Sequence, residues 1–214
     1  TMGSSDLNGL EPYLYKEGFV YHLIPFKKDV KDNGQQTKVN TMVMYNNMMN
    51  KFKFGNYKHA KYLDEQSAGL FYPVMTSDFL ELTQSLMQEG HNDLALKALQ
   101  KYDDEMPDIY PNINIAQSKY FIIDTAYKLH ATEMANRYVS SMDDYITDQL
   151  DYNYSLLQSS PGDVNAQNVQ FGMSVLNAAA NLTKENEQLA LNIKLQAQLN
   201  DYTTKFSGII GKQQ

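Results

Sequence analysis

Four histidines are the side chains best suited to metal binding or acid–base chemistry in this sequence. They are His22, His59, His91 and His130. None has a second histidine within one helical turn, the spacing by which a single helix supplies two zinc ligands. The sequence also lacks an H-E-x-x-H motif, a G-x-S-x-G motif and a glycine-rich phosphate loop. We therefore predict no local zincin, hydrolase or nucleotide-binding centre, while ligands assembled from distant segments stay an open alternative.

Acidic clusters are the second group of residues that could do chemistry. One cluster is Asp103-Asp104-Glu105 and the other is Asp143-Asp144. Glycosidase chemistry needs two carboxyl groups roughly 5–10 Å apart across a cleft, and helical spacing alone gives neither cluster that arrangement. We expect solvated helix faces. The chain has no cysteine, which excludes thiolate nucleophiles and thiolate metal ligands. We predict no catalytic residue, no metal and no cofactor.

A mixture of aromatic and polar residues gives the one positive indication of a binding surface. If the middle of the chain folds as stacked helical pairs, the first helix of each pair lines a concave face. The offset along the first two pairs places Leu80 and Met87 on that face. The predicted partner-binding residues are Gln84, Gln88, Gln117, Tyr120, Asp124, Tyr127 and Lys128. Rings beside amides and charges suit a sugar or a peptide, although any one tyrosine can equally be a core residue whose hydroxyl reaches the surface.

The composition is that of a globular protein. Of the 214 residues, 43% are hydrophobic and 20% charged, and the mean hydropathy is -0.51. No apolar run in this segment approaches the ~18 residues of a membrane-spanning helix. A net charge of -7 and a pI near 5.0 argue against a general nucleic-acid binder, which needs a surplus of lysine and arginine.

Charge is distributed unevenly along the chain. Residues 1–62 hold nine lysines and five acidic residues, which gives a net charge of +4. Since the whole chain has a net charge of -7, residues 63–214 have a net charge of -11. Such asymmetry can orient a domain against an anionic surface. A solvated, lysine-rich face around a loop is the simpler interpretation.

The N-terminal pattern predicts one strand, one loop and one helix. Residues 19–24 are aromatic and β-branched without a helical period, which is typical of a strand. Residues 27–38 are polar around an Asn-Gly pair and predict a loop or hairpin turn. From Asn40 an apolar helical stripe begins and ends near Gly55. Its members are Tyr45, Met48, Met49 and Phe52. We expect this stripe in the core, and the alternative for the methionines at 42, 44, 48 and 49 is a pliable partner-binding face.

The stretch 73–107 shows the spacing of a tetratricopeptide repeat, in which two antiparallel helices pack large residues against small ones. Its pattern residues are Phe79, Leu82, Thr83, Leu86, Gly90, Ala95, Leu99, Tyr102 and Pro107. Gly90 is the expected turn, Ala95 lets the helices approach closely, and Pro107 closes the unit. His91 and the later His130 fall near expected turns, where a surface position is the default.

Two further helical pairs follow. The second is a poorer match with a longer period, and Lys119 occupies a slot that is usually apolar. Its matching residues are Ile123, Ala126, Ala135, Val139 and Met142. In the third pair we expect Asp163 to cap a helix through Val175 and Leu182. The partner helix then runs over about 185–206. Its apolar residues are Leu189, Ile193 and Leu199, and Gly208 and Gly211 mark its end.

These patterns predict a mainly α protein with a tetratricopeptide-like helical-repeat body of α-α hairpins and a short N-terminal β-containing segment. The expected domains are residues 1–39, packing on the body, and 40–214, with a possible break near 159–163. The strand at 19–24 could lack an upstream pairing partner. In that case an unpaired edge would produce a weak, concentration-dependent homodimer.

Part of the chain resembles a known family. Residues 8–25 (NGLEPYLYKEGFVYHLIP), residues 39–56 (VNTMVMYNNMMNKFKFGN) and the step Tyr62-Leu63-Asp64-Glu65 resemble the C-terminal soluble region of a family of large bacterial membrane proteins of unknown function. That family is similar to protein O-mannosyltransferases in its membrane part. The chain begins with Thr1, and we expect it to be a piece of such a longer protein.

The resemblance implies a place and a neighbour for this region. It would lie on the extracytoplasmic, periplasmic face of the inner membrane, and its first partner would be the membrane portion of the parent chain, a glycosyltransferase-like module. No active-site residue of the family falls on these positions. The expected function is a non-catalytic interaction or scaffolding domain that binds a protein, peptide or glycan and no nucleic acid. The alternative is a carbohydrate-active enzyme domain that uses spatially assembled Asp and Glu residues.

Overall fold

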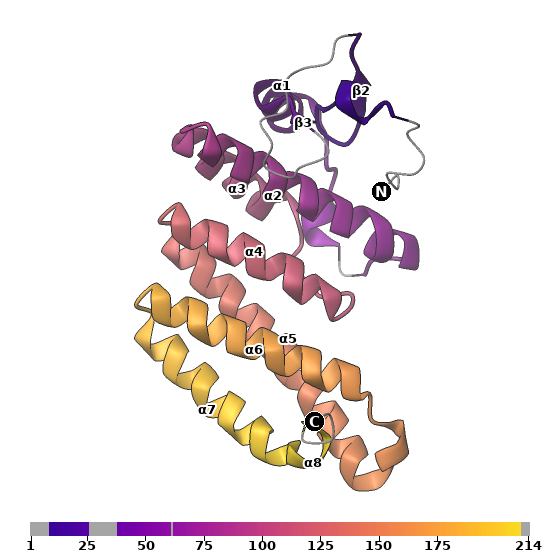
Figure 1. Ribbon diagram of the computed structural model, residues 1–214, viewed down its shortest axis with the longest axis vertical. Coiled ribbons are helices and arrows are strands. Elements are labelled where there is room, and N and C mark those ends of the chain that lie inside the picture. Colours follow the sequence, from indigo (N-terminus) through magenta and orange to yellow (C-terminus); the bar gives the residue numbers. More distant parts are fainter. Residues whose placement is uncertain (1–8, 26–37, 61, 211–214) are drawn as a thin grey trace. The chain divides into compact units, whose positions relative to one another are not determined.

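A computed structural model describes residues 9–25, 38–60 and 62–210 of the chain (Figure 1). It confirms a mainly α fold with a short β segment near the N-terminus. The chain forms two compact units, Thr1–Pro107 and Asp108–Gln214. Within the described ranges, no helix has the length and apolar character required to span a bilayer.

A small sheet opens the first unit. Strand β1 (Leu14–Lys16) follows a single 3-10 turn (Glu11–Tyr13) and pairs on one side with β2 (Tyr21–Leu23), antiparallel, and on the other with β3 (Lys38–Val39), parallel. The strand predicted at 19–24 is confirmed in its centre. It pairs with β1, which lies upstream in the sequence. The homodimer prediction assumed that this upstream strand was absent. Apart from Lys38, the loop predicted at 27–38 lies outside the described residues.

The helix expected after Asn40 forms as α1 (Thr41–Asn46) and continues as one π-helical segment, η3 (Asn47–Lys51). Met44 and Met48 are fully buried, whereas Tyr45 and Met49 are half-buried. The predicted stripe is therefore only partly right. The buried side chains are spaced four residues apart, at Met44 and Met48, so the buried direction of this segment differs from the one predicted through Tyr45.

The helical pair predicted at 73–107 is confirmed as α2 (Tyr72–Gln88) and α3 (Asn92–Glu105), which lie side by side in Figure 1. Two short segments, η4 (Tyr57–His59) and the π-helical η5 (Ser67–Phe71), precede α2. Every apolar residue of the predicted pattern is buried, Ala95 included. The chain turns at Gly90, whose φ of +80° lies in the left-handed region that glycine adopts without strain.

The second unit contains two more hairpins. The first consists of α4 (Asn114–Lys128) and α5 (Thr132–Ser159). A 3-10 turn, η6 (Pro161–Asp163), leads to the second, formed by α6 (Ala166–Glu185) and α7 (Leu189–Lys205), and the short α8 (Ser207–Ile210) follows. Helix α6 packs against α4 and α5, and α7 packs against α5 and α6. All five pattern residues predicted for the first hairpin are buried.

One turn geometry recurs in the three hairpins. Gly90, His130 and Glu187 all have a positive φ, of 80°, 58° and 59°. The next residue donates its backbone N–H to the carbonyl five positions back in each case: His91 to Leu86, Ala131 to Ala126 and Gln188 to Thr183, at 2.8–2.9 Å. This six-to-one bond is the Schellman cap of a helix C-terminus. His91 and His130 are exposed at these turns, as expected.

The third hairpin differs from its prediction in three details. Asn165, not Asp163, caps α6, because its side chain accepts the backbone N–H of Asn168 at 3.0 Å. On α7, Leu189 and Ile193 are exposed, and the buried residues are Leu195, Tyr202 and the following Phe206. Helix α7 ends at Lys205, while Gly208 lies within α8 and Gly211 is outside the described residues.

Candidate functional site

Four of the five predicted binding residues on α4 form one stripe. Gln117, Tyr120, Asp124 and Lys128 recur at intervals of three and four residues, which places them on the same side of the helix. Gln117 and Lys128 are exposed, and Tyr120 and Asp124 are half-buried. Lys128 Nζ lies 2.6 Å from Asp124 Oδ2. We call these four residues the α4 stripe.

Tyr120 lies at the centre of the α4 stripe, among carboxylates from two helices. Burial raises the pKa of its hydroxyl, the negative charges of Asp124 and Glu185 raise it further, and Lys128 opposes them. Glu185 is the last residue of α6, so this end of α6 borders the stripe. The ring of Tyr120 meets Phe121 edge to face at 5.6 Å, and Phe121 is 42% exposed. The stripe therefore presents rings and charges together.

Tyr127 does not lie on this exposed surface, and its part in binding stays a prediction. Its side chain is buried, and its hydroxyl donates to Asn136 Oδ1 at 2.7 Å, while the Asn136 amide donates to Gln188 Oε1 at 2.8 Å. Burial raises the pKa of Tyr127 to about 12. It follows Tyr120 by nearly two helical turns and shares its direction. Near Tyr127, however, Asn136 of α5 and Gln188 of the α6–α7 turn lie against α4.

The other two predicted residues lie on α2 of the first unit. Gln84 is half-buried and Gln88 is exposed. Their participation in a binding surface remains a prediction for the first unit alone.

The predicted solvated acidic faces are partly wrong. Asp143 is buried, its Oδ2 lies 2.7 Å from Lys194 Nζ, and Thr147 donates to its Oδ1 at 3.3 Å. Glu105 pairs with Lys101 at 2.6 Å. Within the described ranges, no three histidine, aspartate or glutamate side chains gather in a way that could hold a metal ion. The Asp143–Lys194 ion pair joins α5 to α7, whereas the Glu105–Lys101 pair lies within α3.

A buried ion cluster that sequence reasoning missed joins the sheet to α2. Lys16 on β1 forms ion pairs with Asp78 and Glu81, the latter at 2.6 Å, and its Nζ lies 5.9 Å from the ring centroid of Tyr21. Burial lowers the pKa of Lys16, but the hydrogen bonds and charges of the two carboxylates outweigh it, so the net shift is upward. No local signal pairs residues more than sixty positions apart.

The ionised form of Asp78 is destabilised by its burial in this cluster. Burial raises its pKa, Lys16 lowers it and the charge of Glu81 raises it, and the net effect is an increase from 3.8 to about 6. Its Oδ2 atom is buried without a hydrogen-bond partner among the described residues. The ionised carboxylate is therefore only partly compensated by Lys16.

We expect the unfolding free energy of the wild type to increase relative to that of Asp78→Asn as the pH falls from 7 to 4. Between pH 6 and 4 the folded chain binds a proton at Asp78 that the unfolded chain, with a pKa near 3.8, has released. Acidification therefore stabilises the fold through this group, by about 2–3 kcal/mol in total. Urea unfolding of both proteins across this range measures it. If the wild type instead loses stability relative to Asp78→Asn as the pH falls, Lys16 holds the pKa of Asp78 low.

No family model matches this chain, and neither a search of curated proteins nor one of solved structures finds a match. The geometry of the described residues is therefore the basis on which a function can be proposed.

Proposed function

We propose that this region is a non-catalytic interaction domain built from tetratricopeptide-like hairpins, and that the α4 stripe binds a protein, peptide or glycan partner. One observation carries the proposal. Tyr120 and Phe121 present adjoining rings between an amide, Gln117, and the charged pair of Asp124 and Lys128. Tyrosine rings with polar neighbours are enriched where proteins bind partners, because they combine apolar contact area with hydrogen bonding.

The recurring turn supports the repeat assignment. Stacked hairpins with the same C-terminal cap place their first helices next to one another, as α4 and α6 are. Glu185 of α6 lies close enough to the α4 stripe for its charge to act on Tyr120. A partner that lies across both helices would meet rings on α4 and charges on each.

The position of this domain in the cell is also a proposal, and it depends on the sequence resemblance alone. We place it on the extracytoplasmic, periplasmic face of the inner membrane, next to the membrane portion of a glycosyltransferase-like parent chain. In that position the partner would be an acceptor protein, a glycan or the parent chain itself, and the acidic net charge disfavours nucleic acid.

The binding proposal is tested by a thermal-shift screen of the 214-residue chain against oligosaccharides and unfolded peptides. A ligand at a hundredfold above its dissociation constant stabilises the fold by about 2.7 kcal/mol. We expect at least one glycan or peptide to raise the melting temperature of the wild type. Tyr120→Ala should abolish that shift, because it removes the central ring of the stripe.

Tyr152→Ala is the matched control. Tyr152 is 61% exposed on α5, outside the α4 stripe, so its loss should leave the ligand-induced shift unchanged. A shift that survives Tyr120→Ala, or the absence of any shift across the panel, would contradict the proposed function.

For the alternative of a carbohydrate-active enzyme, Asp78 and Glu81 are a pair of neighbouring carboxylates to consider. A glycosidase places its carboxyl groups on either side of a cleft that admits the sugar. Here both carboxylates bind the same ammonium group, Lys16, and Asp78 is buried. This arrangement favours a structural role for the pair, and hydrolysis of a glycan that Asp78→Asn abolishes would overturn that assignment.

A further inference from the structure

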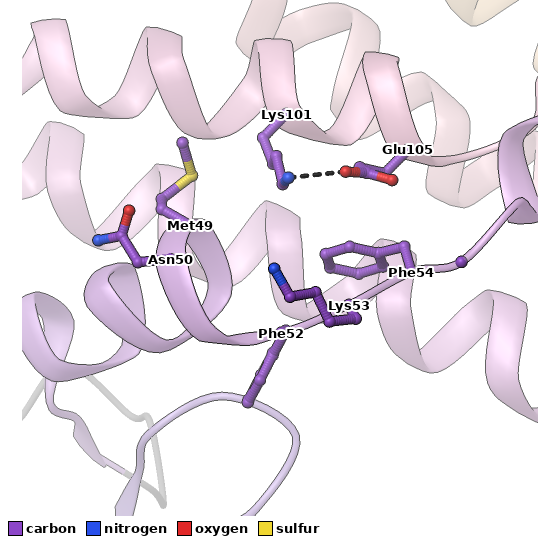
Figure 2. A pocket seen from close by; sticks show the side chains of 8 residues that line it. Met49, Asn50, Phe52, Lys53, Phe54, Lys101 and Glu105 are labelled. Carbon is purple, nitrogen blue, oxygen red and sulfur yellow. Dashed lines mark hydrogen bonds and ion pairs between the residues drawn. The ribbon is translucent and has the colours of Figure 1, made fainter.

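The first unit contains a cleft that shares no residue with the α4 stripe. It has a volume of about 300 Å³ and lies between the end of η3, the segment that follows it, and α3 (Figure 2). The residues that line it are Met49, Asn50, Phe52, Lys53, Phe54, Gly55, Lys101 and Glu105. Its size suits one or two side chains of a bound molecule.

The apolar wall of the cleft is held in place from behind. The ring of Phe54 packs against Phe79 of α2 at 5.6 Å between centroids and meets Phe19 edge to face at 6.3 Å. Phe52 stacks on the same Phe19 at 4.8 Å. Because Phe79 is fully buried, the wall rests on the core of the unit. A ligand would find these rings already positioned.

Two lysines give the cleft its charge. Figure 2 shows the ammonium groups of Lys53 and Lys101 directed into the same space from opposite sides. Lys101 is paired with Glu105 at 2.6 Å and lies 5.6 Å from the ring centroid of Phe54. For Lys53, the described part of the chain supplies no ion-pair partner, and the residue is exposed. Two ammonium groups and one carboxylate leave one positive charge uncompensated.

We propose that this cleft binds a peptide carboxylate that adjoins an apolar side chain. The carboxylate would lie between the ammonium groups of Lys53 and Lys101, and the apolar side chain would pack on Phe54. A single negative charge matches the single uncompensated positive charge. Glu105 disfavours a doubly charged group such as phosphate, because it would repel the second negative charge. The carboxylate can come from an Asp or Glu side chain or from a peptide C-terminus.

NMR titration of the isotope-labelled 214-residue chain tests this. The probes are three short acetylated peptides: Leu-Glu-Leu-amide, the matched Leu-Gln-Leu-amide, and Leu-Gln-Leu with a free C-terminal carboxylate. We expect the two carboxylate peptides to shift the amide signals of Lys53, Phe54 and Lys101, and the uncharged peptide to bind more weakly by about fivefold. Comparison of the first and third peptides tells a side-chain carboxylate from a chain end.

Lys53→Met approximately keeps the length of the side chain and removes its charge. We expect it to weaken the binding of the two carboxylate peptides by about fivefold. Lys51→Met is the matched control, since Lys51 is also exposed and does not line the cleft. Three results would each overturn the proposal: no binding by either carboxylate peptide, equal binding of the uncharged peptide, or equal losses in the two lysine variants. Shifts confined to α4 would support only the α4 stripe, so the two sites are told apart.

Discussion

Phe79→Ala is expected to lower the free energy of unfolding of the first unit by about 3–5 kcal/mol. The ring of Phe79 is fully buried at the centre of α2, with centroid distances of 5.6 Å to both Phe54 and Tyr102. Its removal loses the apolar transfer energy of the ring and leaves a cavity that the helix backbone cannot close. Urea unfolding and amide hydrogen exchange of α2 and α3 measure the loss.

Phe71→Ala supplies the matched comparison for Phe79→Ala. Phe71 ends η5, directly before α2, and is 51% exposed. Because water already reaches its ring, we expect a loss of less than about 1 kcal/mol. Equal losses in the two variants would mean that the packing of Phe79 does not stabilise this unit as the structure indicates.

Asp108→Asn is expected to destabilise the second unit by about 2–3 kcal/mol, whereas Lys119→Met should be nearly neutral. Lys119 is fully buried, and its Nζ donates to Asp108 Oδ1 at 2.9 Å. The same Nζ atom lies 4.6 Å from the ring centroid of Tyr138 and 5.6 Å from that of Tyr110. Asp108→Asn removes the negative charge from beside a buried ammonium group. Lys119→Met removes the buried charge itself and leaves Asp108, whose side chain is 24% exposed, in contact with water.

Urea unfolding of the single variants and the double variant measures this coupling. The matched control is Asp124→Asn, which removes a carboxylate from an ion pair with Lys128, whose side chain is 60% exposed. We expect less than about 1 kcal/mol there, because water replaces the lost interaction. If Asp108→Asn costs no more than Asp124→Asn, or if Lys119→Met is the more damaging change, the buried pair does not stabilise the unit as described.

The local part of the fold could be predicted from the sequence. The periods of apolar residues on α2, α4 and α5 correctly identified the buried face of each helix, and Gly90 correctly marked a turn. His130 and Glu187 adopt the same left-handed turn without glycine. The repeat spacing placed a turn near His130, but residue type identified neither position, because the Schellman hydrogen bonds offset the strain that a Cβ atom adds to a left-handed residue.

The candidate sites could be predicted only in part. Four α4 residues do form one stripe, since helical spacing alone places them on one side. The burial of Tyr127 depends on Asn136 and Gln188, which reach it from α5 and the turn after α6. Periodicity also placed Leu189 and Ile193 of α7 in the core, but both are exposed. A weakly amphipathic helix has two plausible faces, and the packing of its neighbours selects one.

The sequence by itself determined the helical hairpins and the faces that most of them bury, because those properties depend on residues within a few turns of one another. Only the tertiary structure decided which charges meet. Lys16 finds Asp78 and Glu81 across more than sixty residues, and Lys53 and Lys101 converge on one cleft from separate elements. A helical period fixes directions within an element but carries no information about what lies opposite. The chemistry available to this protein therefore depends on how its elements pack.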